Sequence, residues 1–257
     1  MTYLTGKGFI GSNLLAKLPA DTFHIPHENL HTTNFKYYDY FYFLSSYGNM
    51  SDQHSEYDTY RANIEDLLFV IKKSKGIKFK SFVYMSSSSV MLKQQTTYSR
   101  AKRAAEEILL AHIEKNDFPV CIIRPFSVTG VGEQREHLVP TLIDAAMTGK
   151  QINLVPYATH DFIDVDDVTD GILSLSQHGA RGIYQLGTGI KYTNIQVLRL
   201  VEAITGKPIV YKEVGNMRSY DNQDWVSTNF KARGFGWLPK KTLEQSITEM
   251  VGKYVAI

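Results

Sequence analysis

Cysteine is almost absent from this sequence, since Cys121 is the single one among 257 residues. One cysteine cannot form a disulfide within its own chain, so a fold held together by internal disulfides is excluded. Cys121 stands in the apolar run VCIIRP, and we expect it in the core.

Long apolar runs and an excess of charge of one sign are also missing. No stretch approaches the roughly 20 apolar residues that a membrane span needs, and the first residues lack the basic-then-apolar pattern of a secretion signal. Lys and Arg number 28 against 26 Asp and Glu, a net charge of +2 without basic runs, which argues against nucleic acid as the main partner. We therefore expect a cytoplasmic protein that binds neither nucleic acid nor membranes.

Apolar runs suited to buried strands alternate with helical patterns along the chain. The strand-like runs are TYL, YFYFL, SFVYM, VCIIRP and GIYQLG; the helical patterns between them are IGSNLLAKL, YRANIEDLLFVIKKS, RAAEEILLAHIEK and VPTLIDAAMTG. Such alternation predicts an α/β fold, a doubly wound and mostly parallel sheet with right-handed crossovers. Beyond about residue 133 the strands become sparser. We expect this sheet domain in 1–132 and a smaller lobe in 133–257, with the segment at about 155–190 returning to the first domain.

A glycine-rich turn lies at the first carboxyl end of a predicted strand. Gly6-Lys7-Gly8-Phe9-Ile10-Gly11 has the spacing G-x-G-x-x-G directly after a short strand and directly before a helix. Glycines there allow a tight turn and a close approach of the backbone to a pyrophosphate. In this context the pattern favours dinucleotide binding over a turn without a ligand.

Tyr98 and Lys102 lie four residues apart at the start of a predicted helix, where phenol and ammonium can meet. Taken alone, such a pair is more often part of an exposed helix face. A free tyrosine, with a pKa of about 10, is a poor base at neutral pH. A neighbouring ammonium favours the phenolate and brings the pKa nearer the working range of an acid/base catalyst.

Nine segments follow one another in the order of a known family. They are TGKGFIGSNL, FLSSYGN, YRANIEDLL, FVYMSSSSV, YSRAK, IIRPFSVTGVG, HDFIDVDDVTDGIL, GIYQLGTG and GFGWLPKKTLEQSI. Together they resemble the extended short-chain dehydrogenase/reductase family, in its nucleotide-sugar epimerase/dehydratase branch, nearly from end to end. Thr5 departs from the pattern, because a glycine is usual there. The resemblance implies a Rossmann-like fold, a smaller substrate lobe, a nucleotide-linked sugar as substrate, and NADP(H) or NAD(H) as cofactor.

The resemblance also implies roles for single residues. Tyr98 is the expected acid/base, Lys102 tunes it and binds the nicotinamide ribose, and Ser87 holds the reacting sugar oxygen. Ser86 and Ser88 compete for the role of Ser87. The expected cofactor-binding residues are Gly6, Lys7, Gly8, Phe9, Ile10, Gly11, His27, Leu44, Ser45, Ser46, Asn63, Tyr98, Lys102 and Pro125. No metal site is predicted.

Substrate contacts are implied in the same way. Besides Ser87 and Ser88, they include Ser127 in place of a usual asparagine, His160 in place of a usual arginine, and Arg218, whose guanidinium suits a pyrophosphate. For Arg218 a solvated surface arginine is an equal alternative. His137 is a further acid/base candidate, although a lone histidine near a helix start is more often structural.

We expect fewer elements than the family usually has at the edge of the sheet that supports adenine. Only about fourteen residues separate the predicted strands that end near Ile25 and begin near Tyr40, room for a single crossover. We infer that one strand–helix unit of the family is missing. His27 and Glu28 compete for the acidic position at the end of the second strand, and Lys7 lies inside the glycine turn. A cation at His27 and at Lys7 favours NADP(H), whereas Glu28 on the ribose would favour NAD(H).

The residues after the predicted catalytic serine narrow the choice among the reactions of the family. Ser88 and Ser89 stand where family dehydratases carry Asp-Glu, and no cysteine follows as in the double epimerases. What remains is hydride transfer at one carbon, most plausibly C4, by a 4-epimerase or a 4-keto-sugar reductase. The alternative is a non-catalytic sensor or scaffold with a trimmed cofactor site.

By resemblance we also expect a homodimer built on the helices at about 59–74 and 99–115.

Overall fold

The computed structural model describes residues 1–49, 53, 55–116, 118–215, 221 and 224–255, and it divides into two compact units. The first unit comprises Met1–Pro125, Thr169–Gln185 and Phe230–Trp237; the second comprises Phe126–Val168, Leu186–Asn229 and Leu238–Ile257. The boundary thus lies at 125/126, whereas the sequence analysis placed it at 132/133. Two segments return to the first unit, at 169–185 and 230–237, where one at about 155–190 was expected.

A six-stranded sheet forms the centre of the first unit, in the order β10-β5-β4-β3-β1-β2. The four pairs from β5 to β2 are parallel. This confirms the predicted α/β, Rossmann-like class. The strands are β1 (Thr2–Thr5), β2 (Phe23–Ile25), β3 (Tyr40–Phe43), β4 (Ser81–Met85), β5 (Val120–Pro125) and β10 (Gly182–Leu186).

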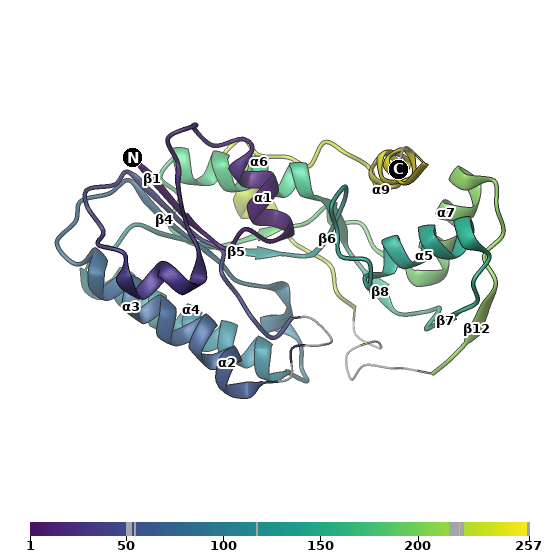
Figure 1. Ribbon diagram of the computed structural model, residues 1–257, viewed down its shortest axis with the longest axis horizontal. Helices are drawn as coiled ribbons and strands as arrows, with labels where there is room; N and C mark the ends of the chain where they lie inside the picture. Colours follow the sequence, from purple (N-terminus) through teal and green to yellow (C-terminus); the bar gives the residue numbers. More distant parts are fainter. Residues whose placement is uncertain (50–52, 54, 117, 216–220, 222–223, 256–257) are drawn as a thin grey trace. The chain divides into compact units, whose positions relative to one another are not determined.

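Helices cover both faces of this sheet, which is why its inner strands are apolar at successive positions. All five residues of β4 are buried. On one face lie α1 and α6, and on the other lie α2, α3 and α4 (Figure 1). Their bounds are α1 Phe9–Leu15, α2 Glu56–Tyr60, α3 Asp66–Ser74, α4 Thr97–Asn116, α6 Val165–Gln177 and the short α8 Phe230–Arg233, with a π-helical turn η2 at Arg61–Glu65 between α2 and α3.

Aromatic side chains fill the core between the sheet and α3 and α4. Neighbouring strands stack Phe41 on Phe82 at 5.3 Å and Phe43 on Tyr84 at 5.9 Å between ring centroids. Offset aromatic pairs of this kind add to the free energy gained by burial. The aromatic strands YFYFL and SFVYM are therefore held in register side by side.

The edge of the sheet ends at β2, and the missing strand–helix unit is confirmed. Between β2 and β3 the chain forms only a 3₁₀ helix, η1, at His27–Thr32. Asp66, at the start of α3 and fully buried, holds this helix. Its two carboxylate oxygens bond His27 Nε2 at 3.0 Å and His31 Nε2 at 2.7 Å.

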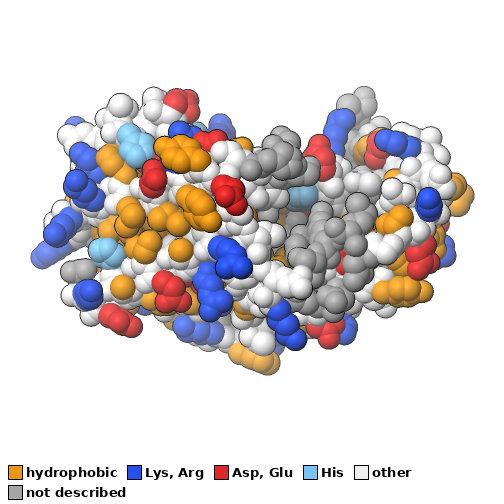
Figure 2. Space-filling model, turned by 90° about the horizontal axis from the view of Figure 1, so that it is seen from below, with side chains coloured by type: hydrophobic (Ala, Val, Ile, Leu, Met, Phe, Trp, Pro, Cys, Tyr) orange, Lys and Arg blue, Asp and Glu red, His pale blue; other side chains and the backbone are white. Residues whose placement is uncertain are grey.

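The outer face of α2, η2 and α3 exposes apolar side chains. Tyr57, Tyr60 and Leu68 are 67%, 40% and 42% exposed. Seen from this side, hydrophobic side chains gather among Lys and Arg side chains (Figure 2). Among the described helices, none is long and apolar enough to cross a bilayer.

The second unit packs three helices on pairs of short strands (Figure 1). Its core joins apolar residues of all three helices, including Val139, Leu198 and Ile247. The helices are α5 (Leu138–Thr148), α7 (Asn194–Thr205) and α9 (Leu243–Val255); the strand pairs are β6 (Ser127–Thr129) with β9 (Phe162–Asp164), β8 (Thr159–His160) with β11 (Tyr192–Thr193), and β7 (Ile152–Leu154) with β12 (Tyr211–Glu213).

Candidate active site

The glycine turn joins β1 to α1 at the carboxyl end of the sheet. Gly6 has a φ of +81°, and a Cβ on it would lie 2.5 Å from the carbonyl carbon of Leu44. A Cβ on Gly11 would lie 1.8 Å from Gly6 O, so the helix can only approach the turn because glycine stands there. Gly8 faces open space, because a Cβ there would meet nothing within 4 Å. The turn therefore leaves room for a pyrophosphate against its backbone, as the predicted role requires.

The loop after β3 lies against this turn. Leu44 and Ser45 are buried, whereas Ser46 is exposed. Asn63, fully buried in η2, donates from Nδ2 to Tyr47 O and to Thr59 O, both at 2.8 Å. Asn63 thus ties the loop to the helix behind it. In the structure this predicted cofactor residue shapes the wall of the site.

The serine loop after β4 separates the three candidates for the catalytic serine. Ser86 is buried and donates from Oγ to Glu106. Ser87 begins the 3₁₀ helix η3 (Ser88–Met91), and its Oγ accepts from Ser89 N at 3.1 Å. Ser88 is buried and Ser87 only half-buried. Of the three, Ser87 is the hydroxyl that hydrogen-bonds the Tyr98 phenol.

Lys102 lies one turn after Tyr98 on α4 and is fully buried. Its Nζ donates to Met85 O at 2.7 Å, at the carboxyl end of β4. The same ammonium lies 4.8 Å from the ring centroid of Tyr84 and 5.8 Å from that of Tyr98. The predicted pair is therefore brought together against the end of the sheet. Pro125, at the end of β5, is buried.

The pKa values of this pair differ from the simple expectation. Burial raises the pKa of Tyr98 to about 12, while hydrogen bonds from Ser87 and Ser46 act to lower it. Burial lowers the pKa of Lys102 to about 7, against a smaller opposite effect of the Glu106 carboxylate. The chain's own groups thus do not lower the pKa of Tyr98 as Lys102 was expected to do.

A buried ionic cluster behind Lys102 was not predicted. Glu106 lies one turn further along α4, is 1% exposed, and accepts from Arg124 Nε at 2.9 Å and from Arg124 Nη2. Its other contact is the Ser86 hydroxyl. The signal in the sequence was the spacing Lys-x-x-x-Glu, which places both charges on one face of the helix.

A cavity of about 280 Å³ opens on the cofactor side of the first unit. Four of its lining residues, Tyr47, Asp58, Arg61 and Ala62, were missed by the sequence analysis. His27, predicted at this place, reaches it from η1, whereas the competing Glu28 is exposed and is not among the described lining residues. The lining consists of Gly6, His27, Ser45, Ser46, Tyr47, Asp58, Arg61 and Ala62.

Two predicted substrate residues of the second unit lie together. Ser127 Oγ and His160 Nδ1 are 3.2 Å apart, and the His160 ring lies 5.6 Å from that of Trp225. His137 precedes α5, and its Nδ1 lies 3.1 Å from Oε1 of Glu133, whose side chain is 4% exposed. Arg218 lies outside the described residues.

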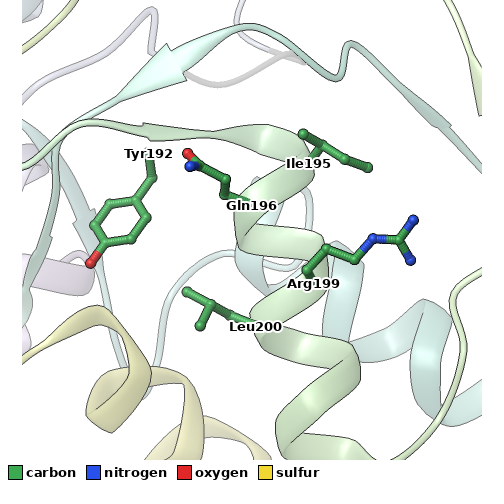
Figure 3. Close-up of a pocket in the computed structure, with 5 residues that line it drawn as sticks. All are labelled: Tyr192, Ile195, Gln196, Arg199 and Leu200. Atoms are coloured by element: carbon green, nitrogen blue, oxygen red, sulfur yellow. The ribbon is translucent and has the colours of Figure 1, made fainter.

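Another cavity, of about 370 Å³, lies in the second unit along β11 and α7 (Figure 3). Its lining is mostly apolar and includes none of the predicted site residues. It is formed by Tyr192, Ile195, Gln196, Arg199 and Leu200.

A parallel sheet of this order, with a glycine turn after β1 and a Tyr-x-x-x-Lys helix beside β4, defines a Rossmann-type protein of the short-chain dehydrogenase/reductase class. The model of the NAD dependent epimerase/dehydratase family matches residues 3–187, and the chain belongs to this family.

Individual relatives are more distant. UDP-glucose 4-epimerase of Yersinia enterocolitica is 26% identical over 240 residues, which cover 78% of this chain and 70% of that one. Among solved structures, a UDP-N-acetylglucosamine 4-epimerase from Methanobrevibacter ruminantium in complex with UDP-N-acetylmuramic acid has a TM-score of 0.88 at 17% identity, covering 99% and 98% of the two chains. RMD from Pseudomonas aeruginosa, complexed with NADPH, has a TM-score of 0.84 at 17% identity over 99% of each.

Proposed function

We propose that this chain transfers hydride at C4 of a nucleotide-linked sugar, as a 4-epimerase or a 4-keto-sugar reductase. The observation that carries the proposal is the meeting of Ser87 and Lys102 at Tyr98 beside the end of β4. The UDP-sugar named in the descriptions of two relatives supports a nucleotide sugar as the substrate class.

Each residue of this group has a role in the proposed reaction. When the sugar is oxidised, Tyr98 takes the proton of the 4-hydroxyl while C4 loses its hydrogen as hydride. Ser87 donates a hydrogen bond to the same sugar oxygen and holds it next to the phenol. The chemistry that a bound nicotinamide supplies is the transfer of hydride from and to C4. In the reverse direction Tyr98 returns the proton to the alkoxide that forms.

The deprotonation of Tyr98, which makes it a base, requires a further positive charge. The chain's own groups leave the pKa of Tyr98 at about 12, and burial lowers the pKa of Lys102 to about 7. A bound oxidised nicotinamide would supply the positive charge that favours the phenolate. Oxidation at C4 is therefore expected to depend on the oxidised cofactor for its base as well as for its hydride acceptor.

Cofactor choice separates the two reactions. An epimerase retains one NAD through the catalytic cycle, whereas a reductase exchanges its cofactor at every turnover. We favour NADP(H), on Lys7 in the glycine turn and His27 in the cavity beside it, and with it the reductase. The family description names NAD, so the epimerase stands as the second candidate. We further propose a cytoplasmic homodimer.

The test begins with nicotinamide difference spectra of the purified protein with NAD(H) and NADP(H). Binding of either supports an enzyme, whereas no response to both would favour the sensor or scaffold. The protein is then incubated with UDP-glucose without added cofactor, and product is analysed by chromatography. Conversion to the 4-epimer, with NAD copurifying, would establish the epimerase. Consumption of NADPH only with a 4-keto sugar nucleotide would establish the reductase.

A further inference from the structure

We propose that Arg61 binds a phosphate group of the dinucleotide and so replaces part of the support lost with the missing strand–helix unit. The inference rests on the proposed function, because it concerns the same cofactor. Neither the glycine turn nor the resemblance assigns this residue a role.

The position of Arg61 is set by an irregularity of the helix. Arg61 is the first residue of the π-helical turn η2, between α2 and α3. π-Helical turns inside α-helices are rare and are frequent at functional sites. Two residues later, Asn63 is buried and holds Tyr47 O, so the turn is fixed against the loop after β3. The widened turn thus places Arg61 in the wall of the same cavity as Gly6.

The guanidinium of Arg61 has unused capacity to donate. Nη2 lies 3.1 Å from Asp58 Oδ1, and both side chains are partly exposed, at 42% and 36%. The Nε atom is buried and has no hydrogen-bond partner within the described part of the chain. Exposed ion pairs of this kind contribute little, whereas a phosphate accepts two parallel bonds from the guanidinium fork. A phosphate can therefore replace the contact of Nη2 with Asp58 at the exposed part of the side chain.

The other cations near this cavity are placed less favourably. Lys7 is exposed in the glycine turn and is not one of the described lining residues. His27 lines the cavity, but its Nε2 is bonded to the buried Asp66 carboxylate. Arg61 is thus the permanent positive charge among the described lining residues, and Asp58 is the negative charge beside it.

A dinucleotide offers two sources of phosphate, the pyrophosphate of either cofactor and the 2′-phosphate of NADP(H). Dissociation constants for NADPH and NADH are measured by titration calorimetry with the full chain, for wild type, Arg61→Gln, Arg61→Lys and the exposed control Arg103→Gln. We expect Arg61→Gln to weaken binding about ten- to a hundredfold, Arg61→Lys less, and Arg103→Gln less than twofold. Equal losses for both cofactors identify the pyrophosphate, and a loss for NADPH alone identifies the 2′-phosphate.

Asp58→Asn separates phosphate binding from a structural effect of the lost ion pair. If Arg61 binds phosphate, this variant keeps or improves affinity, because the guanidinium is released from its carboxylate. Affinities of Arg61→Gln within twofold of wild type for both cofactors would overturn the inference, as would an equal loss in Asp58→Asn. A wild type that binds neither cofactor would instead refute the proposed function itself.

Discussion

Two hydroxyls and one ammonium surround the Tyr98 phenol, and they act on it in different ways. Ser87 and Ser46 hydrogen-bond the phenol and lower its pKa, while burial raises it to about 12. The Lys102 Nζ lies 5.8 Å from the centroid of the ring, and burial lowers the pKa of Lys102 itself. The pKa of Tyr98 is therefore sensitive to any positive group that binds beside the phenol.

Tyr98→Phe removes the group to which proton transfer is assigned. We expect turnover to fall about 10²–10⁴-fold, the contribution of a positioned acid/base, while affinity for the cofactor stays within a few-fold. Steady-state assays and cofactor titration measure the two effects. Tyr37→Phe, at an exposed position, is the matched control. A Tyr98→Phe variant with near wild-type activity would show that another group carries the proton.

The burial of Lys102 also predicts how stability depends on pH. Its pKa is about 7 in the folded chain against 10.5 as the ordinary value, so between pH 7 and 10.5 the unfolded chain binds more protons. Stability from this group consequently rises with pH through that window, by at most about 1.4 kcal/mol per pH unit. At pH 7 and below, the folded chain bears the full cost of a buried ammonium.

We therefore expect Lys102→Met to be more stable than wild type at pH 6–7, with an advantage that shrinks toward pH 10. Urea denaturation at pH 6, 8 and 10 measures the free energy of unfolding of both proteins. Groups that both proteins contain titrate in the same way, so their effect cancels when the two free energies are subtracted. Lys115→Met, exposed near the end of the same helix, should show no such trend. An advantage of the variant that grows with pH would contradict the sign of the pKa shift.

At the scale of elements, the ion pair of Glu106 and Arg124 fastens α4 to the ends of β4 and β5. Glu106 belongs to the helix, Arg124 to β5, and Ser86 follows β4. We expect Glu106→Gln to lower the free energy of unfolding by about 2–3 kcal/mol, because Arg124, with 19% of its side chain exposed, loses its charged partner. Urea denaturation measures it, with the exposed neighbour Glu107→Gln as the control. A loss below 0.5 kcal/mol, equal to the control, would show that the cluster is not stabilising.

The order of strands and helices in the first unit followed from the sequence for a physical reason. Strands covered on both faces must be apolar along their length, so YFYFL and SFVYM could be recognised without any partner. The missing unit followed from counting residues between Ile25 and Tyr40. The strand pairs of the second unit are only two or three residues long, too short for a pattern to stand out.

The π-helical turn and its consequences could not be predicted. The segment YRANIEDLL carries no local signal for one extra residue in a helix turn, so no role was predicted for Arg61. Roles for Tyr98, Lys102 and Ser87 could be predicted because the motifs that contain them are short stretches of the chain. The bonds of Asp66 to His27 and His31 join residues 35–39 positions apart, and no local pattern encodes them.

At the scale of the whole molecule, the exposed apolar side chains of one helical face predict self-association. Tyr57 and Tyr60 lie three residues apart in α2, and Leu68 lies in α3, all three exposed. Their face, in the view of Figure 2, is rich in hydrophobic side chains bordered by Lys and Arg. Tyr60 and Leu68 fall within one of the two helices, at about 59–74 and 99–115, on which the sequence analysis builds a homodimer.

We accordingly expect a homodimer in which this face packs against its copy, with α4 beside it in a four-helix bundle. A charge in the centre of such an interface is costly because it must be desolvated. Leu68→Asp should therefore shift sedimentation from dimer to monomer at micromolar concentration. Leu238→Asp, which introduces the same change at a leucine that is 53% exposed in the second unit, should leave the dimer intact. A wild type that sediments as a monomer would count against the interface, and a dimer that survives Leu68→Asp would place it on another face.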